Sequence, residues 1–388
     1  MAGLLVISSP TLARSLSSVI FKPQAGAIQW NGEDRITVAM LGLTQRTTEP
    51  ARTDTLLLMD IDPSHHVIHM LSVPRDLWVD IPGYGYGKLA IPYEIGGARL
   101  TAYTLERDLG IPIDYTMALT FRGFIRIVNA MGGVEVNVPR RLNDPLYPCL
   151  TGYAYCPIDI RKGPQHMSGY QALEFVRERH AFAQQDLARV QDQQAFSEAV
   201  KSTLLSPFTW PHNPAMLSAL KSSLITNLPW NDLPELGIQY LLASKNQLTH
   251  NYIKMSNGLV QPAVSADGQD ILEPTSSSGI PNLVHKLFSD PTIAPEHATI
   301  AVLNGTNQTG LAADVEGTLK GMGFNAVSAG NANNASYQRT RVIENTAVGG
   351  SADYTARRLQ RILEAQLQQQ AMPGQSARLV VIVGSDFP

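Results

Sequence analysis

The sequence has little charge and no long apolar run, and these two absences exclude several classes of protein. Only 16% of its 388 residues are charged, the net charge is −3, and no cluster of lysines and arginines stands out. Bulk electrostatic attraction to nucleic acid is therefore excluded, and we expect no nucleic-acid partner. No stretch reaches about 18 apolar residues, so no complete transmembrane helix is predicted.

Cysteine is almost absent as well. The two cysteines, Cys149 and Cys156, stand in the segment CLTGYAYC. A zinc site would need more ligands nearby, and a CxxC redox pair needs closer spacing. We expect either a disulfide that closes this loop, which would place the chain outside the cytoplasm, or two unpaired thiols.

Three common catalytic motifs are also missing, namely GxSxG, HExxH and GxxxxGK[ST]. Arginine is unevenly distributed, since it is frequent from Arg35 to Arg189 and absent from 190 to 338. The planar guanidinium group donates two parallel hydrogen bonds and suits phosphate recognition. The pattern favours a phosphate-binding pocket over a site with a protein nucleophile.

Apolar runs of strand length alternate with helical patterns from Ile36 onward. ITVAMLGL, TLLLMDI and VIHMLSV suit strands buried on both faces, and DYTMALTF and GVEVNVP read as further strands. RLTAYTLERDLG and RGFIRIVNAMGG read as helices that end at glycines. This alternation predicts an α/β domain with a central mixed sheet flanked by helices.

The length of the chain predicts more than one domain. We expect an N-terminal tail or membrane-anchor remnant over residues 1–33 and a core over 34–205. A mostly helical extension with linker should follow over 206–295, and a small C-terminal αβ domain over 296–388. The opening MAGLLVISSP is too short for a membrane span or a full signal peptide. It is either a frayed apolar tail or the remnant of an anchor lost through a truncated or misplaced start.

Charged residues mark the ends of two predicted strands. Arg52 and Asp54 open the first strand, and Arg75 and Asp76 follow the second, directly after Pro74. If the strands form a hairpin, the four side chains meet at one end of the sheet, where open α/β folds bind their ligands. A pair of structural salt bridges is the alternative.

Two further segments carry arginines and a carboxylate. Arg177 and Arg179 follow the apolar run ALEFV, and an extended chain after a helix end would let both reach one ligand. Asp186, Arg189 and Gln193 have the spacing of one helix face. Solvated arginines and a surface ion pair are the alternatives. In a phosphate pocket, arginines would neutralise oxygens while a carboxylate holds Mg²⁺ or accepts a proton.

Six motifs in order resemble the LytR-CpsA-Psr family over roughly residues 35–205, namely RTDTLLL, SVPRD, KLAIPYEIGG, MGGVEVNVP, GYQALEFVRER and DLARVQDQQ. VLNGTNQTGLA and VVIVGSDF resemble the C-terminal domain often attached to this family. The resemblance implies a phosphotransferase anchored at the extracytoplasmic face of the membrane. Such an enzyme moves a glycopolymer from a polyprenyl-pyrophosphate carrier to peptidoglycan, using Mg²⁺. Its partners would be the lipid-linked glycan, peptidoglycan and the membrane surface.

The resemblance also implies roles for single residues. Asp54, Arg75 and Asp76 would be catalytic, with Asp54 also near the metal and Asp186 in a supporting position. The positions that match the pyrophosphate site are Arg52, Arg75, Lys88, Arg177, Arg179, Arg189 and Gln193.

Two positions depart from the family pattern. Thr44 stands where the family has an acidic metal ligand, and Asp192 stands where it has an arginine. The first change predicts weaker metal binding at a site of Asp54 and Thr44, and the second alters a supporting contact. Two other functions therefore stay open, a non-catalytic binder of polyprenyl-linked lipids and a pyrophosphate hydrolase that uses water as acceptor.

Overall fold

The computed structural model describes residues 28–44, 50–150, 154–178, 185–204, 214–243 and 247–388. They belong to two compact units. The first contains the residues up to Leu41, Thr55–Met117 and Thr226–Pro388, and the second contains Gly42–Asp54 and Ala118–Ile225. Among the described helices, none is both long enough and apolar enough to cross a membrane.

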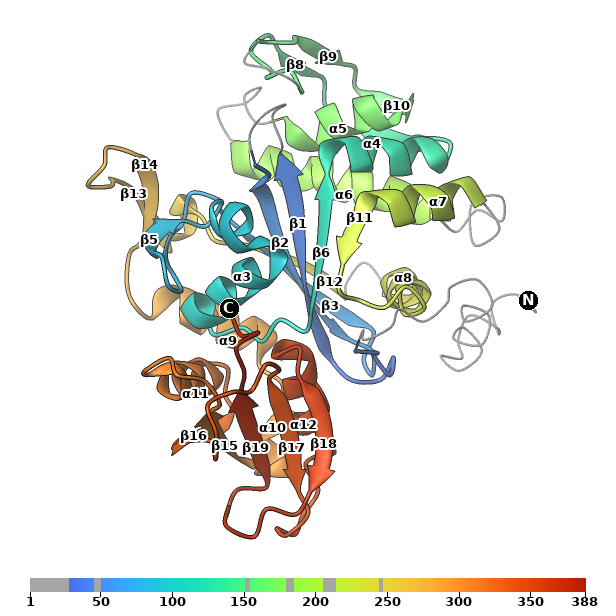
Figure 1. The fold of residues 1–388 in the computed structure, drawn as a ribbon. Helices are drawn as coiled ribbons and strands as arrows, with labels where there is room; N and C mark the ends of the chain where they lie inside the picture. The colour runs from blue at the N-terminus through green and yellow to red at the C-terminus, as the bar shows by residue number, and fades with distance from the viewer. Residues whose placement is uncertain (1–27, 45–49, 151–153, 179–184, 205–213, 244–246) are drawn as a thin grey trace, which may run out of the picture. The chain divides into compact units, whose positions relative to one another are not determined.

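The largest sheet has six strands in the order β11-β6-β1-β2-β3-β12 (Figure 1). Strand β2 pairs antiparallel with β3, and β3 pairs parallel with β12, so the sheet is mixed, as predicted. The apolar runs form its inner strands, where side chains such as Leu58 and Leu71 are fully buried. The strands are β1 (Ile36–Thr44), β2 (Arg52–Asp62), β3 (Val67–Val73), β6 (Tyr115–Thr120), β11 (Leu224–Thr226) and β12 (Leu248–Tyr252).

The segment expected to be mostly helical, 206–295, also contributes strands, so that expectation was wrong in part. Strands β11 and β12 lie at the two edges of the large sheet, where β6 and β3 supply their hydrogen-bonding partners. The segment further contains α7 (Pro214–Ser223), α8 (Leu233–Leu242), the 3-10 helix η1 (Met255–Asn257), β13 (Val260–Val264), β14 (Asp270–Pro274), α9 (Gly279–Phe288) and α10 (Ile293–Glu296).

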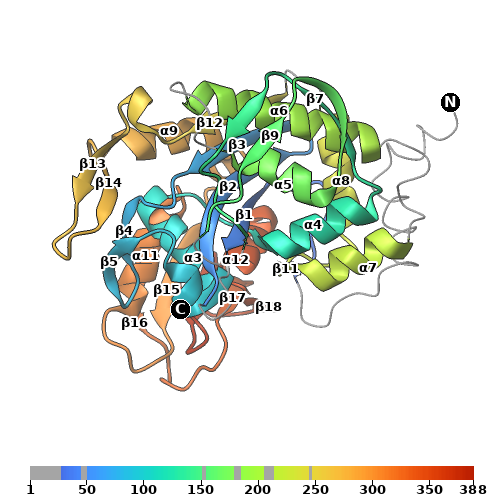
Figure 2. The ribbon, with the colours of Figure 1, turned by 90° about the horizontal axis from the view of Figure 1, so that it is seen from above.

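In the first unit, two hairpins and a long helix follow β3. The hairpin of β4 (Trp78–Ile81) and β5 (Gly85–Lys88) lies beside the hairpin β13–β14, and a bridge between Leu77 and Leu272 joins them (Figure 2). Helix α3 (Pro92–Leu109) ends at Gly110, which adopts a left-handed conformation with φ 67°. Glycine takes this conformation at little steric cost, so the predicted helix end is confirmed.

The second unit packs α4 (Phe121–Ala130), α5 (Gly169–Arg177) and α6 (Gln185–Leu204) around a small sheet of β7 (Val134–Val138) and β10 (Gly163–Met167). The predicted strand β7 pairs with β10 and does not join the large sheet. The hydroxyl of Ser168 caps α5, as expected from the sequence. A side chain at Gly169 would put its Cβ 2.3 Å from the carbonyl oxygen of Ile125, so glycine permits the close approach of α5 to α4.

The predicted C-terminal αβ module is confirmed, and it belongs to the first unit (orange to red in Figure 1). Its five strands follow the order β16-β15-β19-β17-β18, and β17 pairs antiparallel with β19, so β17 and β18 run opposite to the other three strands. The elements are β15 (Thr299–Asn304), α11 (Leu311–Gly321), β16 (Asn325–Asn331), β17 (Arg341–Asn345), α12 (Asp353–Ile362), β18 (Gln366–Gln370) and β19 (Leu379–Val383).

Helix α12 is fixed to the rest of the first unit by a set of ion pairs that we call the α12 charge cluster. Its members are Asp34, Asp114, Asp290, Arg357, Arg358 and Arg361. Arg361 Nε donates to Asp114 Oδ1 at 2.8 Å, and Arg357 binds both oxygens of Asp34 at 2.8 and 2.9 Å. Asp34 lies just before β1 and Asp114 just before β6. The C-terminal module therefore contacts the large sheet at the end where β1 and β6 begin.

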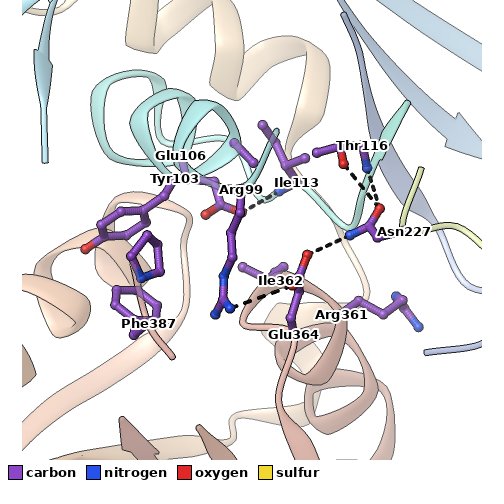
Figure 3. A pocket seen from close by; sticks show the side chains of 12 residues that line it. Arg99, Tyr103, Glu106, Ile113, Thr116, Asn227, Arg361, Ile362, Glu364 and Phe387 are labelled. Atoms are coloured by element: carbon purple, nitrogen blue, oxygen red, sulfur yellow. Dashed lines mark hydrogen bonds and ion pairs between the residues drawn. The ribbon is translucent and has the colours of Figure 1, made fainter. Parts of the chain in front are cut away.

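A small cavity lies beside this cluster (Figure 3). Its volume is about 20 Å³, which is room for about one water molecule. Asn227 crosses it, accepting a hydrogen bond from the amide of Thr116 at 2.7 Å and donating one to Glu364 at 2.9 Å. Burial holds the pKa of the neighbouring Glu106 carboxyl well above its usual range. The cavity is too small for a lipid substrate, and we assign it a structural role.

Candidate functional site

The hairpin β2–β3 extends two charged segments from one of its ends. Its register pairs Leu56 with Val73 in antiparallel fashion. Residues before Leu56 and residues after Val73 therefore continue from the same end of the hairpin. Strand β2 opens there at Arg52, and Arg75 follows β3. The hairpin on which the sequence prediction depended is present.

Arg75, Asp76 and Lys88 form a charged group within the first unit. Arg75 Nε donates to Asp76 Oδ2 at 3.5 Å, and Lys88 Nζ lies 3.3 Å from Asp76 Oδ1. The main chain is held by hydrogen bonds from Ala90 to the carbonyl of Arg75 and from Leu272 to that of Asp76, both 2.9 Å. The three side chains stay partly exposed, so two cations are presented to solvent from a fixed backbone.

Thr44 is the last residue of β1, and β1 neighbours β2 in the sheet. Residues 45–51 are too few for the crossover that parallel neighbours need, which is about a dozen residues or more. The two strands are therefore antiparallel, and Thr44 lies at the end of the sheet where β2 opens with Arg52 and Asp54. Within the described part of the chain, no group of three or more histidine, cysteine, aspartate or glutamate side chains is placed to hold a metal.

Arg177 lies against two aromatic rings of the second unit. Its guanidinium carbon is 4.1 Å from the centroid of the Phe121 ring and 5.6 Å from that of Tyr147. Its Nη1 donates a hydrogen bond to the hydroxyl of Tyr147 at 3.2 Å. Among the described residues, no carboxylate lies within ion-pair distance of Arg177. The rings orient the cation without neutralising its charge.

Helix α5 ends at Arg177, and Glu178 has an extended conformation with φ −55° and ψ 133°. The predicted helix end is thus confirmed, whereas Arg179 lies outside the described residues. The backbone of α6 carries Asp186, Arg189 and Gln193, whose side chains also lie outside the described residues. Their roles, like those of the other site residues, stay predictions.

Asp192, which departs from the family pattern, forms an ion pair with Arg140 at 2.5 Å. The Asp192 side chain is almost fully buried, and this burial raises its pKa to about 6, although Arg140 acts in the opposite direction. A carboxylate in this position is therefore compensated by an arginine from the segment after β7.

Cys149 and Cys156 form a disulfide with a Cα–Cα distance of 5.0 Å, which confirms the first of the two expectations for this pair. The disulfide closes a loop whose two sides are also joined by an isolated antiparallel β-bridge between Pro148 and Tyr155. The sulfur atoms are bonded to each other and are not available for a metal.

Protein exported to an oxidising compartment should therefore be two hydrogens lighter than its dithiol form. Oxidation removes one hydrogen from each thiol. We expect intact-mass measurement without reductant to show this difference, and alkylating reagent to leave Cys149 and Cys156 unmodified. Full alkylation of both residues in the unreduced protein would contradict the assignment.

Sequence reasoning missed Phe121 and Tyr147. Phe121 begins α4 directly after β6, and Tyr147 stands two residues before Cys149. Neither has a spacing that points to Arg177, because the three residues come from separate parts of the second unit. The nearness of Tyr147 to a cysteine pair is the one signal that could have drawn attention to it.

Comparison with known proteins extends these observations. The LytR_cpsA_psr family profile matches residues 11–275, and a profile described as LytR cell envelope-related transcriptional attenuator matches residues 297–387. The chain is 25% identical over 246 residues to the regulatory protein MsrR of Staphylococcus aureus, covering 62% of this chain and 72% of MsrR. It is 32% identical over 206 residues to the polyisoprenyl-teichoic acid–peptidoglycan teichoic acid transferase TagT of Bacillus subtilis, covering 52% of this chain and 62% of TagT.

Solved structures show the same fold. A structure of TagT bound to LIIa-WTA matches with a TM-score of 0.50 and 25% identity, over 69% of this chain and 95% of that one. The family profile, over residues 11–275, spans every strand of the mixed sheet and covers well over half of the chain. The protein is therefore a member of the LytR-CpsA-Psr family.

Proposed function

We propose that this protein transfers a glycopolymer from a polyprenyl-pyrophosphate carrier to a hydroxyl group of the cell wall, in peptidoglycan for example. The observation that carries the proposal is the arrangement of Arg177. A half-buried guanidinium that is held by rings and a neutral hydroxyl keeps its positive charge for an anionic ligand. Similarity to a named teichoic acid transferase supports a lipid-linked glycopolymer as the ligand class.

In this reaction the acceptor hydroxyl attacks the phosphorus atom that carries the glycan. A new oxygen–phosphorus bond forms, the bridging bond of the pyrophosphate breaks, and polyprenyl phosphate leaves. The arginines and Lys88 neutralise the phosphate oxygens, which become more negative in the transition state. We assign Asp54 as the acceptor of the hydroxyl proton, with Arg75 and Asp76 positioning the reacting phosphate.

The donor set at the strand ends fits a weakly held Mg²⁺. Such an ion is usually bound by one or two carboxylates together with substrate phosphates, and here Asp54 would supply the carboxylate and Thr44 a neutral hydroxyl. When bound, Mg²⁺ would stabilise negative charge on the phosphate oxygens. Because Thr44 replaces an acid, we infer that the ion arrives largely with the pyrophosphate.

Thr44→Asp should therefore raise the affinity for Mg²⁺ in the absence of lipid, because it adds a second carboxylate. Without metal, the same change should weaken pyrophosphate binding, because it places a negative charge beside an anion. Titration calorimetry of both proteins with Mg²⁺, with and without geranylgeranyl pyrophosphate, measures both effects. Tight Mg²⁺ binding by the unsubstituted, lipid-free protein would show that another residue replaces the missing acid.

The location we propose is the outer face of the cell membrane. The disulfide supports an oxidising compartment, since cytoplasmic proteins rarely keep one. A polyprenyl carrier remains in the bilayer, so the site must work at the membrane surface.

The test combines lipid analysis with a transfer assay. Mass spectrometry of lipid extracted from protein produced in bacteria should show a polyprenyl pyrophosphate or its glycan-linked form. Incubation with a lipid-pyrophosphate glycan, peptidoglycan and Mg²⁺ should then yield polyprenyl phosphate and labelled peptidoglycan. Release of free glycan phosphate with unlabelled peptidoglycan would indicate a hydrolase. Binding without turnover would favour the second candidate, a non-catalytic lipid binder, which the replacement of an acidic metal ligand by Thr44 suggests.

A further inference from the structure

The loop that contains the disulfide also contains Tyr147, the residue that forms a hydrogen bond with Arg177. Tyr147 is 2% exposed, and its hydroxyl accepts the hydrogen bond from Arg177 Nη1. Its main-chain carbonyl accepts a hydrogen bond from the amide of Cys156 at 2.7 Å. Two residues after Tyr147, on the same side of the loop, the amide of Cys149 donates to the carbonyl of Ala154 at 2.9 Å. The disulfide thus links the two sides of the loop that holds Tyr147.

Tyr147 suits an arginine that must stay charged. Burial raises the pKa of Tyr147 to about 12, so its hydroxyl is neutral at physiological pH. A neutral oxygen can orient the guanidinium without cancelling its charge, in contrast to Asp159, which binds Arg141 through both oxygens. Phe121 covers a face of the same guanidinium and limits its rotation.

We propose that Tyr147 is a positioning residue for Arg177, and that the Cys149–Cys156 disulfide keeps it in place, so that anion binding at Arg177 depends on the redox state of this loop. The proposal rests on the proposed function for the identity of the anion, a lipid pyrophosphate. A dithiol reductant would break the sulfur–sulfur bond, leave one thiol on each cysteine and become a disulfide itself. The loop would then hold Tyr147 through its hydrogen bonds alone.

The test compares three variants of the full chain with the unsubstituted protein, with geranylgeranyl pyrophosphate as the probe. Tyr147→Phe removes only the hydroxyl and should weaken binding about 3-fold to 10-fold. The double change Cys149→Ser and Cys156→Ser should weaken it to a similar degree. The control is Tyr155→Phe, since Tyr155 lies in the same loop but is exposed, and we expect no change.

A spectroscopic measurement separates positioning from general stability. In protein with ¹⁵N-labelled arginine, the two rings should shift the Arg177 Nε–Hε resonance from its free value, and Arg177→Lys identifies the signal. Tyr147→Phe and the cysteine variant should move this resonance while the other arginine signals stay in place. An unmoved resonance together with unchanged affinity in folded variants would overturn the proposal.

The two proposals can fail separately. If the unsubstituted protein does not bind the pyrophosphate probe, the proposed function is wrong, yet the Arg177 resonance still reports whether Tyr147 and the disulfide position the side chain. If the probe binds and Tyr147→Phe has no effect on affinity or resonance, only the positioning role is wrong. Should the cysteine variant fail to fold, Tyr147→Phe decides the positioning role, and the affinity of the unsubstituted protein after treatment with a dithiol reductant decides the role of the disulfide.

Discussion

Arg75→Ala is expected to reduce the affinity for geranylgeranyl pyrophosphate at least ~10-fold while leaving the fold intact. A hydrogen bond to a charged group contributes about 1.5–3 kcal/mol, and about 1.4 kcal/mol corresponds to a factor of ten. The fold should survive because the Arg75 side chain is partly exposed and its main chain keeps its hydrogen bond from Ala90. Titration calorimetry gives the affinity, and thermal unfolding gives the stability.

Arg107→Ala is a matched control for this experiment. The Arg107 side chain is 36% exposed and pairs with Asp80 at 3.0 Å, whereas Arg75 is 41% exposed and pairs with Asp76. Each change removes a partly exposed arginine that forms an ion pair with an aspartate of the first unit. Arg107, however, lies on α3 and is not a predicted site residue. Equal losses of affinity in the two variants, or none in Arg75→Ala, would remove Arg75 from the pyrophosphate site.

Asp114→Asn should lower the free energy of unfolding by about 3–5 kcal/mol, the usual cost of leaving a buried charge without its partner. Asp114 Oδ1 accepts from Arg361 Nε at 2.8 Å, and its Oδ2 accepts from the amide of Thr37 at 2.8 Å. Arg358 Nη2 lies 3.6 Å from the same carboxylate, and both arginines are buried. Urea unfolding followed by circular dichroism measures the change.

Asp159→Asn is the corresponding exposed control. Asp159 binds Arg141 through two hydrogen bonds of 2.6 and 2.7 Å, so its geometry is at least as good as that of Asp114. Both side chains are exposed to water, at 62% and 48%. Water replaces a lost partner at such a position, and we expect no measurable shift of the unfolding midpoint. If the two variants unfold alike, the α12 charge cluster does not hold the C-terminal module in place.

The sequence could predict that Arg52 and Arg75 lie at one end of a hairpin, because the pairing of two strands follows from the apolar runs on either side of a short turn. The apolar runs on either side of a short turn set β2 against β3, and Arg52 and Arg75 follow from their positions in these runs. The partners of the site residues could not be predicted in this way. Lys88 reaches Asp76 only because β4 and β5 fold back beside the end of β3.

By itself, the sequence determined the features that depend on near neighbours. The inner strands of the large sheet, the Ser168 cap, the helix end at Gly110 and the closely spaced disulfide all follow from interactions within a few residues. The tertiary structure decided which strands join which sheet, so that β7 pairs with β10 and β12 extends the large sheet. It also decided that Arg177 meets Phe121 and Tyr147, and that α12 meets acids before β1 and β6. These contacts depend on how segments that are distant in the sequence bury apolar surface and pair their charges. A local sequence pattern contains no information about which distant segments will meet.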